Sequence, residues 1–572
     1  MRTNKRSVIR LLEQIAVYLE LKGENHFKIA AYRRAASALE ADGRDLSEIS
    51  HFTDIPNIGK TTASVIEEFV ETGRSTLLEQ LKDEVPKGLV PLMEIQGLGA
   101  RKISRLYREL GITDADSLRK ACEEGKVERL KGFGKTTQSN ILHALDQLSG
   151  KPAYTIGRLL PVLLLIEETL SGNRKIETYS RAGSIRRFEE RIEELDYVIS
   201  TFDPKSVAED ILQMNEVVEA VSIRSLKVTA KLKGEAGLRI NFRIAKPDLY
   251  ALTLFLSTGP EPHLEKMQQI AGLHGERLTK SGVKILKTGE LLRFPSEASF
   301  YHHYGLPYIP PEIRADGSEV ETYKGTPFVQ FDDIKGDLHM HTVWSDGKDS
   351  LEDMVNACRK RGYEYIAITD HSKYLKVAGG LSRERLIRQM NEIRRLNEKY
   401  PDILILSGIE MDILPDGTLD FDDDVLSGLD FVIASIHSGF GNSRAQIMKR
   451  LHSALFNPHV DMIAHPTGRL IGKRQGYDVD LDLLFQWAKE TGTILELSGD
   501  PARLDLSAAR AREAQAAGVK IAINTDAHAT AELGNIAFGV GTARKGWIER
   551  KNVVNTYTKE QLLDFLKQKH QH

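Results

Sequence analysis

The spacing of apolar side chains changes along the chain and predicts regions of different secondary structure. In residues 1–149 the apolar positions recur every three or four residues, which is typical of amphipathic helices. From 151 to 311 the pattern is mixed, and the segments 195–199 and 238–245 are predicted to be strands. The middle region is therefore expected to combine a sheet with helices.

From residue 336 onward, short apolar strands alternate with helical segments, which indicates a parallel sheet with crossover helices. The number of repeated units suits a closed barrel, and we expect a distorted (βα)7 barrel. The predicted strands are Asp337–Thr342, Tyr365–Thr369, Ile403–Ile409, Phe431–Ile436, Met462–Ala464, Thr493–Leu497 and Val519–Asn524.

Length and charge narrow the class of protein. A chain of 572 residues is long enough for about three to five domains. Its 78 Lys and Arg residues nearly balance 81 Asp and Glu residues, which excludes a polybasic protein that holds nucleic acid by bulk charge. Any contact with nucleic acid must therefore be local.

The cysteine count and the N-terminus bear on the compartment. Cys122 and Cys358 are too few for a disulfide framework or a cysteine zinc site, which favours a reducing compartment. The N-terminus continues as a charged helix, and no run approaches about 18 uninterrupted apolar residues. We expect a cytoplasmic monomer that does not span a membrane.

Three short turns in the helical region, at 55–60, 95–102 and 130–135, each lead into a predicted helix. A glycine, or Asn57 in the first turn, stands where the backbone needs positive φ. Each turn aims amide groups of a helix N-terminus outward beside a lysine, which suits a phosphate oxygen. The residues concerned are Gly59, Lys60, Gly97, Gly99, Lys102, Gly132, Gly134 and Lys135.

A single turn of this kind is more often a glycine helix cap beside a solvated lysine. Three copies favour phosphate binding, and they resemble helix-hairpin-helix motifs, which bind DNA backbones without reading the base sequence in known families. A chain with balanced charge can bind DNA in this way.

Imidazole and carboxylate side chains gather at the carboxyl ends of the barrel strands, where barrel enzymes place their chemistry. Isolated examples are more often buried hydrogen-bonded histidines or capping aspartates, but nine together favour a metal site. Such ligands suit zinc, manganese or iron, and nine are too many for one ion but match two or three. The residues are His339, His341, Asp346, His371, Glu410, His437, His465, Asp526 and His528.

The motifs that carry these residues resemble the polymerase-and-histidinol-phosphatase (PHP) domain family, and all nine metal-binding positions of that family are filled. The resemblance implies phosphoester hydrolysis on a trinuclear centre. Lys373 and Arg469 are either phosphate contacts or solvated surface residues. The motifs are Asp337-Leu-His-Met-His-Thr, Ser345-Asp-Gly, Thr369-Asp-His, Gly408-Ile-Glu, His437-Ser, Ala464-His-Pro and Asn524-Thr-Asp-Ala-His.

The middle region resembles the palm of family X DNA polymerases through the segments 183–187, 195–199 and 238–244. With the hairpins, the whole chain resembles a bacterial family X DNA polymerase that carries a C-terminal PHP domain. The resemblance implies a helix-hairpin-helix domain at 1–87, a fingers-like hairpin pair at 88–150, an α+β palm and thumb at 151–315, a linker at 316–335 and the PHP domain at 336–572.

In that family a Gly-Ser and an arginine pair hold the incoming triphosphate, and three aspartates bind two magnesium ions. The phosphate-binding positions here are Gly183, Ser184, Arg186 and Arg187, and the aspartate positions are Glu194, Asp196 and Asn241.

The substitutions at the aspartate positions bear on mechanism. Mg²⁺ requires oxygen ligands in near-ideal octahedral geometry, so the longer Glu194 and the neutral Asn241 are poorly suited to it. We predict weak or absent nucleotidyl transfer. The Schiff-base lysine of some relatives would fall on Val65, which argues against lyase activity by that route.

Three hypotheses follow for the function. The preferred one is a DNA-repair nuclease that acts on gapped, nicked or 3′ ends of DNA as a 3′–5′ exonuclease, with cutting at abasic sites as in some relatives. The second is a gap-filling polymerase in which the PHP domain proofreads. The third, from another class, is a DNA-binding scaffold with a structural metal site.

Overall fold

The computed structural model describes residues 5–42, 44, 46, 49, 51–95, 98–130, 132–134, 138, 141–142, 145, 154–215, 217–224, 226–232 and 238–570. The chain forms two compact units, one of residues 1–151 with 373–380 and the other of residues 152–372 with 381–572. In the described ranges, no helix combines the length and the apolar character that crossing a membrane requires.

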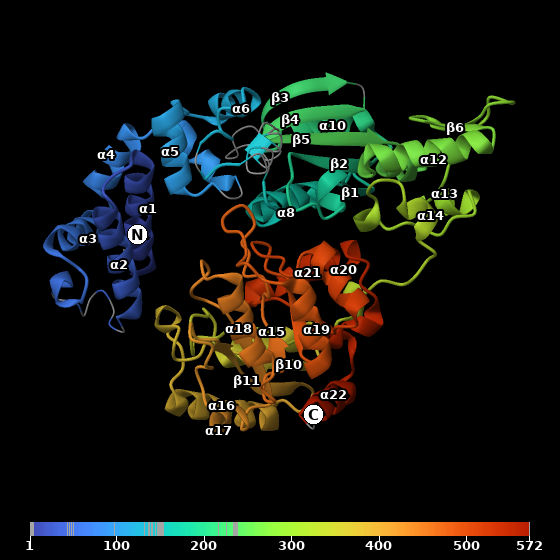
Figure 1. Ribbon diagram of the computed structural model, residues 1–572. Helices are drawn as coiled ribbons and strands as arrows, with labels where there is room; N and C mark the ends of the chain where they lie inside the picture. Colours follow the sequence, from blue (N-terminus) through green and yellow to red (C-terminus); the bar gives the residue numbers. More distant parts are fainter. Residues whose placement is uncertain are drawn as a thin grey trace. The chain divides into compact units, whose positions relative to one another are not determined.

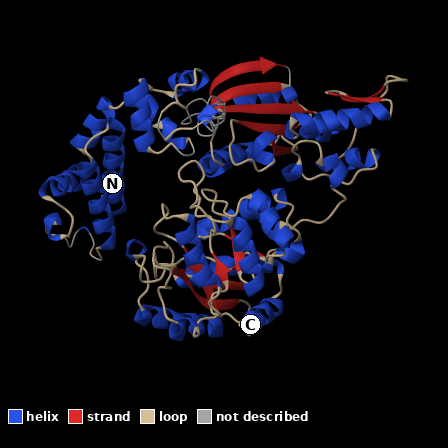
Figure 2. Ribbon diagram, in the orientation of Figure 1, coloured by secondary structure: helices blue, strands red, loops and turns tan. Residues whose placement is uncertain are grey.

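The described residues of the first unit up to 145 form helices and no strand (Figures 1 and 2). Local signals set the helix ends: the side chain of Asn25 accepts a hydrogen bond from the Phe27 amide, and Gly73 and Gly111 end helices in the left-handed conformation. The helices are α1 (Lys5–Lys22), α2 (His26–Ala41), α3 (Lys60–Thr72), α4 (Thr76–Glu84), α5 (Ala100–Leu110) and α6 (Ala115–Glu123).

These helices bury two apolar clusters. The first joins α1 to α2, α3 and α4, and the second surrounds α5 and α6 and extends to Phe133 and Leu145. The helical periodicity predicted for this region is therefore confirmed, because the apolar faces pack against one another.

The palm-like region contains a mixed five-stranded sheet in the order β1-β2-β5-β4-β3, in which β2 and β5 run parallel. Helices α8 and α10 pack on one face, and α11 packs on the other. The elements are α8 (Ile156–Gly172), β1 (Thr178–Ala182), α9 (Gly183–Arg186), β2 (Glu194–Ser200), α10 (Pro204–Leu212), β3 (Val217–Arg224), β4 (Lys227–Leu232), β5 (Arg239–Ala245) and α11 (Pro247–Thr258).

The thumb-like region packs an aromatic core around Phe255, Phe300 and Tyr301, and the guanidinium of Arg314 lies fully buried against these rings. The stretch 316–335 contributes buried side chains, including Val320 in α14, to this core. The elements are α12 (Glu261–Leu273), β6 (Glu276–Thr279), β7 (Gly282–Ile285), β8 (Leu291–Leu292), α13 (Glu297–His303) and α14 (Glu319–Thr322).

The C-terminal region is the expected parallel barrel, with its seven strands in sequential order from β9 to β15. The strands are β9 (Gly336–Asp337), β10 (Tyr365–Ile368), β11 (Leu404–Asp412), β12 (Phe431–Ser435), β13 (Met462–Ile463), β14 (Ile494–Ser498) and β15 (Ile521–Asn524). The helices are α15 (Leu351–Lys360), α16 (Arg383–Lys399), α17 (Asp423–Leu426), α18 (Arg444–Leu455), α19 (Leu481–Thr491), α20 (Ala508–Ala517), α21 (Ile536–Lys545) and α22 (Lys559–Lys569).

The first and last strands of the barrel meet through side chains as well as backbone. An isolated bridge joins Met340 to Ala527, while the Leu338 amide donates to the side chain of Asn524. The first strand is consequently shorter than the predicted Asp337–Thr342, because side-chain acceptors replace ladder partners here. The third strand is longer than predicted, since β11 continues to Asp412.

A substitution in the palm sheet tests how much its apolar packing contributes to stability. Phe242 is fully buried in β5, and its ring lies 5.9 Å from that of Tyr197. We expect Phe242→Ala to lower the free energy of unfolding by about 3–5 kcal/mol, because it removes apolar contacts and leaves a cavity. Equilibrium urea unfolding measures the loss. The control Phe202→Ala removes a ring that is 75% exposed and should change stability by less than about 0.5 kcal/mol.

Candidate metal centre and polymerase-like site

All nine predicted metal-binding side chains converge at one end of the barrel. Their ligand atoms form three overlapping groups, and His465 joins them through Nε2, which lies 3.0 Å from Glu410 Oε1. The groups are His341, Asp346, His371 and His528, then His339, His341 and Asp526, and then His371, Glu410 and His437.

Two features of the barrel backbone position these side chains: the ends of the strands and two residues with unusual φ values. Glu410 lies within β11 rather than after it, and the other candidate ligands lie beyond the strand residues. His465 and Asp526 adopt positive φ values of 29° and 54°. Non-glycine residues rarely hold such conformations, which persist where the surrounding structure and a functional site require them.

Two carboxylates outside the cluster and one backbone carbonyl within it orient three of its imidazole rings. His339 Nδ1 lies 2.8 Å from Glu496, His437 Nδ1 lies 3.2 Å from Asp412, and His528 Nδ1 lies 2.8 Å from the Asp526 carbonyl. A proton held on Nδ1 leaves Nε2 with its lone pair toward the cluster, as in carboxylate–histidine–metal arrangements.

The unpaired nitrogen atoms of the cluster fit bound cations. Nδ1 of His341, His371 and His465 is buried without a hydrogen-bond partner, although His371 Nδ1 lies 2.9 Å from Glu410. His339 Nε2 and His341 Nε2 lie 3.2 Å apart. Lone pairs that point together in a buried space are satisfied by a shared divalent ion.

The pKa values of the imidazoles in the cluster differ. Burial opposes protonation of His437 and His528, but neighbouring carboxylates raise the pKa of His437 to about 10 and that of His528 to about 9. Burial and the neighbouring rings of His528 and His371 lower the pKa of His341 to about 3, so this ring stays neutral. Burial opposes ionisation of Glu410, but the charges of His437 and His371 hold its pKa well below the usual value. A divalent metal binds neutral imidazoles and ionised carboxylates, so metal binding would release protons from rings such as His437 and His528.

Two buried aspartates hold the loops that carry candidate ligands. Asp370 accepts hydrogen bonds from the side chains of Thr342, Ser345 and Gln389, which fixes the turn before Asp346. Asp337 accepts from the amide and hydroxyl of Thr525, the residue before Asp526.

Three cationic side chains bear on phosphate binding, the two predicted from the sequence and Arg503. Arg469 forms a two-pronged pair with Glu190 at 2.7 and 3.2 Å, and Lys373 is exposed on the loop after His371. The guanidinium that borders the cluster is that of Arg503, whose Nε lies 3.4 Å from Asp526 Oδ2.

In the polymerase-like site an arginine supplies the charge beside the central carboxylate. Asp196 and Asn241 lie opposite each other on β2 and β5, and Glu194 is half-buried at the start of β2. Arg243 donates to Asp196 at 2.5 Å, and Thr229 donates to Asn241 at 2.9 Å. Burial raises the pKa of Asp196 although Arg243 opposes this shift.

The predicted triphosphate-binding residues occupy the short turn α9. Gly183 has φ of 61°, and a Cβ there would lie 2.6 Å from Asp196 Oδ2, so the turn requires glycine. Arg186 donates to Glu297 at 2.6 Å, and Arg187 donates to the Thr258 carbonyl at 2.5 Å. Ser184, which follows Gly183, is half-buried. Arg186 thus connects the palm to the thumb, while Arg187 binds the C-terminal end of α11.

Two of the hairpins begin helices without side-chain caps. Gly59 and Gly99 are the N-caps of α3 and α5, and among the described residues no side-chain cap is found at the start of either helix. Lys60 is exposed at the first of these helix N-termini. These features match an opening for a phosphate oxygen.

The conformations predicted for the turns are partly tested. Asn57 and Gly132 have φ of 71° and 89°, as expected. Gly134 accepts the first helical hydrogen bond of the third hairpin through its carbonyl, from the Gln138 amide at 2.9 Å. Lys102 lies over the Phe133 ring at 5.8 Å, which places the second and third hairpins against each other. Gly97 and Lys135 lie outside the described residues.

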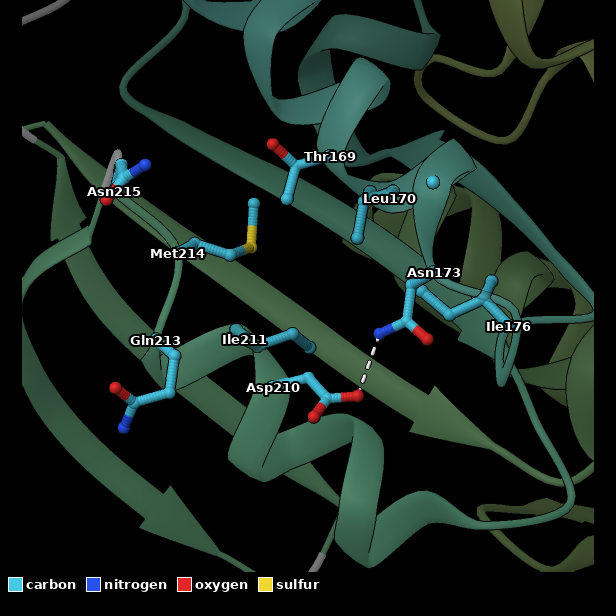
Figure 3. A pocket seen from close by; sticks show the side chains of 10 residues that line it. Thr169, Leu170, Asn173, Ile176, Asp210, Ile211, Gln213, Met214 and Asn215 are labelled. Atoms are coloured by element: carbon cyan, nitrogen blue, oxygen red, sulfur yellow. Dashed lines mark hydrogen bonds between the residues drawn. The ribbon is translucent and has the colours of Figure 1, made fainter.

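A separate cavity of about 350 Å³ lies between α8 and α10 (Figure 3). Asn173 and Asp210 point toward each other across it and hydrogen bond at 2.9 Å, and Leu170, Ile211 and Met214 supply apolar walls. None of the predicted nucleotide-binding residues lines this cavity.

Comparison with known proteins places the sites in a family. Residues 3–75 match the helix-hairpin-helix domain, 253–315 the DNA polymerase beta thumb and 337–498 the PHP domain. The chain is 50% identical over 566 residues to "DNA polymerase/3'-5' exonuclease PolX" of Bacillus subtilis (strain 168), across 99% of both chains. The chain belongs to the bacterial family X DNA polymerases with a C-terminal PHP domain.

The PHP region also has relatives without the polymerase part. A protein of Thermoanaerobacter sp. (strain X514) named "Probable phosphatase" is 28% identical over 247 residues, which cover 41% of this chain and 94% of the relative. Another of that name, from Caldanaerobacter subterraneus subsp. tengcongensis, is 30% identical over 213 residues, covering 35% and 78%. The barrel of this family X polymerase thus occurs as a separate unit in other proteins.

Sequence reasoning missed several residues around the two sites. Glu496 and Asp412 are charged residues within otherwise apolar strands, and that anomaly could have identified them. Arg503 and Arg243 carry no such signal, because their partners, Asp526 and Asp196, are distant in sequence.

We expect His339→Ala to reduce the number of divalent ions bound per chain, because His339 Nε2 faces the cluster. Metal analysis of the purified protein measures this number. His452→Ala is the matched control, since that ring stacks on Phe456 in the barrel at 4.2 Å and joins none of the ligand groups. Unchanged metal content in His339→Ala would contradict the assignment.

We expect Glu496→Gln to weaken metal affinity about 10- to 100-fold, because it removes the carboxylate that orients His339. Competition with a chelator of known affinity measures the change. Glu490→Gln, at an exposed position of α19, should leave the affinity unaltered.

Proposed function

We propose that this protein removes nucleotides from 3′ ends of DNA by metal-dependent hydrolysis at its PHP centre, acting in DNA repair. The observation that carries the proposal is the convergence of nine imidazole and carboxylate groups at one end of the barrel. The name of the Bacillus subtilis relative, which includes 3′–5′ exonuclease, supports the same activity. Cutting at abasic sites is a further activity to test with the same centre.

The proposed ligands are the nine residues predicted from the sequence, holding two or three ions of manganese, zinc or iron. When bound, closely spaced divalent ions activate the attacking water and stabilise charge on the phosphate. Glu410 and Asp526 contribute negative charge, and Glu496 and Asp412 keep His339 and His437 correctly oriented.

Arg503 is the side chain that we propose contacts the phosphate of the DNA substrate. Its guanidinium borders Asp526 and is 19% exposed, so it can pair with a non-bridging phosphate oxygen while remaining held by carboxylates. Arg469, which the sequence offered for this role, is engaged by Glu190.

We also propose that the hairpins hold the DNA backbone through the helix N-termini at Gly59 and Gly99. Contacts of this kind are independent of base sequence, which suits a repair protein that meets ends, gaps and nicks at any position.

We further propose that nucleotidyl transfer is weak or lost. Asn241 is neutral and bonded to Thr229, and the Asp196 carboxylate is paired with Arg243. Two carboxylates, one of them already neutralised, are a poor site for two magnesium ions.

Gap-filling synthesis is the second candidate, because the name of the same relative also includes DNA polymerase. Primer extension and 3′-end digestion with Mn²⁺, on single-stranded, gapped and abasic substrates, separate the two. The preferred function requires that the wild-type protein digests 3′ ends and that His339→Ala abolishes this digestion. If the wild-type protein incorporates nucleotides efficiently and Asp196→Ala abolishes the incorporation, the proposal that synthesis is weak or lost is wrong. Absence of both activities in the metal-loaded chain would favour a DNA-binding scaffold.

We expect Asn241→Asp to restore part of the nucleotide incorporation, because it returns a charged oxygen ligand opposite Asp196. The variant should leave 3′-end digestion unchanged. A variant that still fails to extend a primer would show that the amide is not the main defect.

A further inference from the structure

The loop between β14 and α20, residues 499–507, connects the metal centre to the palm. Arg503 borders Asp526 at 3.4 Å, and the next residue, Leu504, belongs to the apolar cluster of the palm. Adjacent side chains of one loop thus lie in two different structural regions. The position of Arg503 therefore depends on how firmly the palm holds Leu504.

The palm holds this loop with apolar contacts. Leu504 is 3% exposed in the same cluster as Leu159 and Leu163 of α8. Pro501 approaches α8 so closely that a Cβ added at Gly157 would lie 3.1 Å from it. The loop is consequently packed on the palm helix along several residues.

The palm also holds the loop through an ion pair. Glu190 accepts two hydrogen bonds from Arg469, at 2.7 and 3.2 Å, and Arg469 donates in turn to the Leu504 carbonyl. A guanidinium shared between a carboxylate and a carbonyl fixes the direction of that peptide group. Arg469 and Glu190 are only 20% and 34% exposed, which reduces screening by water.

We propose that Glu190 of the palm is a positioning residue for the nuclease centre, acting through Arg469 and the Leu504 carbonyl to place Arg503 beside Asp526. This inference rests on the proposed nuclease function and deepens it. In this proposal the palm aids hydrolysis by holding a loop of the barrel in place. This role is independent of any role in binding DNA or nucleotides.

Hydrolysis of a small phosphodiester tests this positioning role without requiring the protein to bind DNA. We expect Glu190→Gln to lower kcat/KM for bis(4-nitrophenyl) phosphate with Mn²⁺ about tenfold in the full-length protein, with the metal content unchanged. The matched control is Glu189→Gln, because the adjacent Glu189 pairs with Lys545 at 3.0 Å and does not contact Arg469. Wild-type rates in Glu190→Gln would overturn the proposal.

A double variant distinguishes positioning from general stability. In an Arg503→Ala background, Glu190→Gln should cause no further loss, since Glu190 acts through that side chain. A further tenfold loss, or loss of bound metal, would mean that Glu190 supports the barrel in another way and would overturn the proposal.

Hydrogen exchange provides a test that does not depend on activity. Glu190→Gln should increase amide exchange in residues 499–507, whereas Glu189→Gln should not. Unchanged exchange in this loop contradicts the inference even if the wild-type protein proves inactive. Inactivity of the metal-loaded wild type toward both DNA and the small diester would instead refute the proposed nuclease function.

Discussion

The barrel gathers nine ionisable groups at one end, six of them buried, and must offset the cost of desolvating their charges. Uncompensated burial of even one charge is strongly unfavourable, so the arrangement is stable only when positive and negative groups alternate closely. Glu410 meets this requirement by lying within 3.5 Å of five imidazoles, those of His339, His341, His371, His437 and His465. The outer carboxylates Glu496 and Asp412 meet the same requirement, since they lie 2.8 and 3.2 Å from His339 and His437.

The convergence of the nine candidate ligands was predictable from the sequence because these residues lie at or near the ends of strands. Six of the seven strands, all except β14, carry a candidate ligand near their carboxyl ends, and parallel strands bring those ends together, so position in the sequence determines position in space. The hairpin turns were predictable for a similar reason, since Asn57 and Gly132 mark backbone that needs positive φ. In both cases local sequence determines the relevant geometry.

Contacts between distant segments could not be predicted in this way. Glu190 and Arg469 are 279 residues apart, and each resembles an ordinary surface residue in its own segment. Arg243 likewise reads as the polar face of a strand, although it neutralises Asp196. The pairing of such residues depends on how folded elements dock, which the spacing of apolar side chains does not encode.

The docking of Leu504 into the palm has a consequence for how this chain can evolve. One face of the palm sheet holds the barrel loop through the α8 cluster, while Asn241 belongs to the polymerase-like site. Selection for a stable barrel can preserve the face of the sheet that packs against α8, while the face that carries Asn241 accumulates substitutions. The packing of Leu504 on the palm can thus constrain the palm fold independently of the residues of the polymerase-like site.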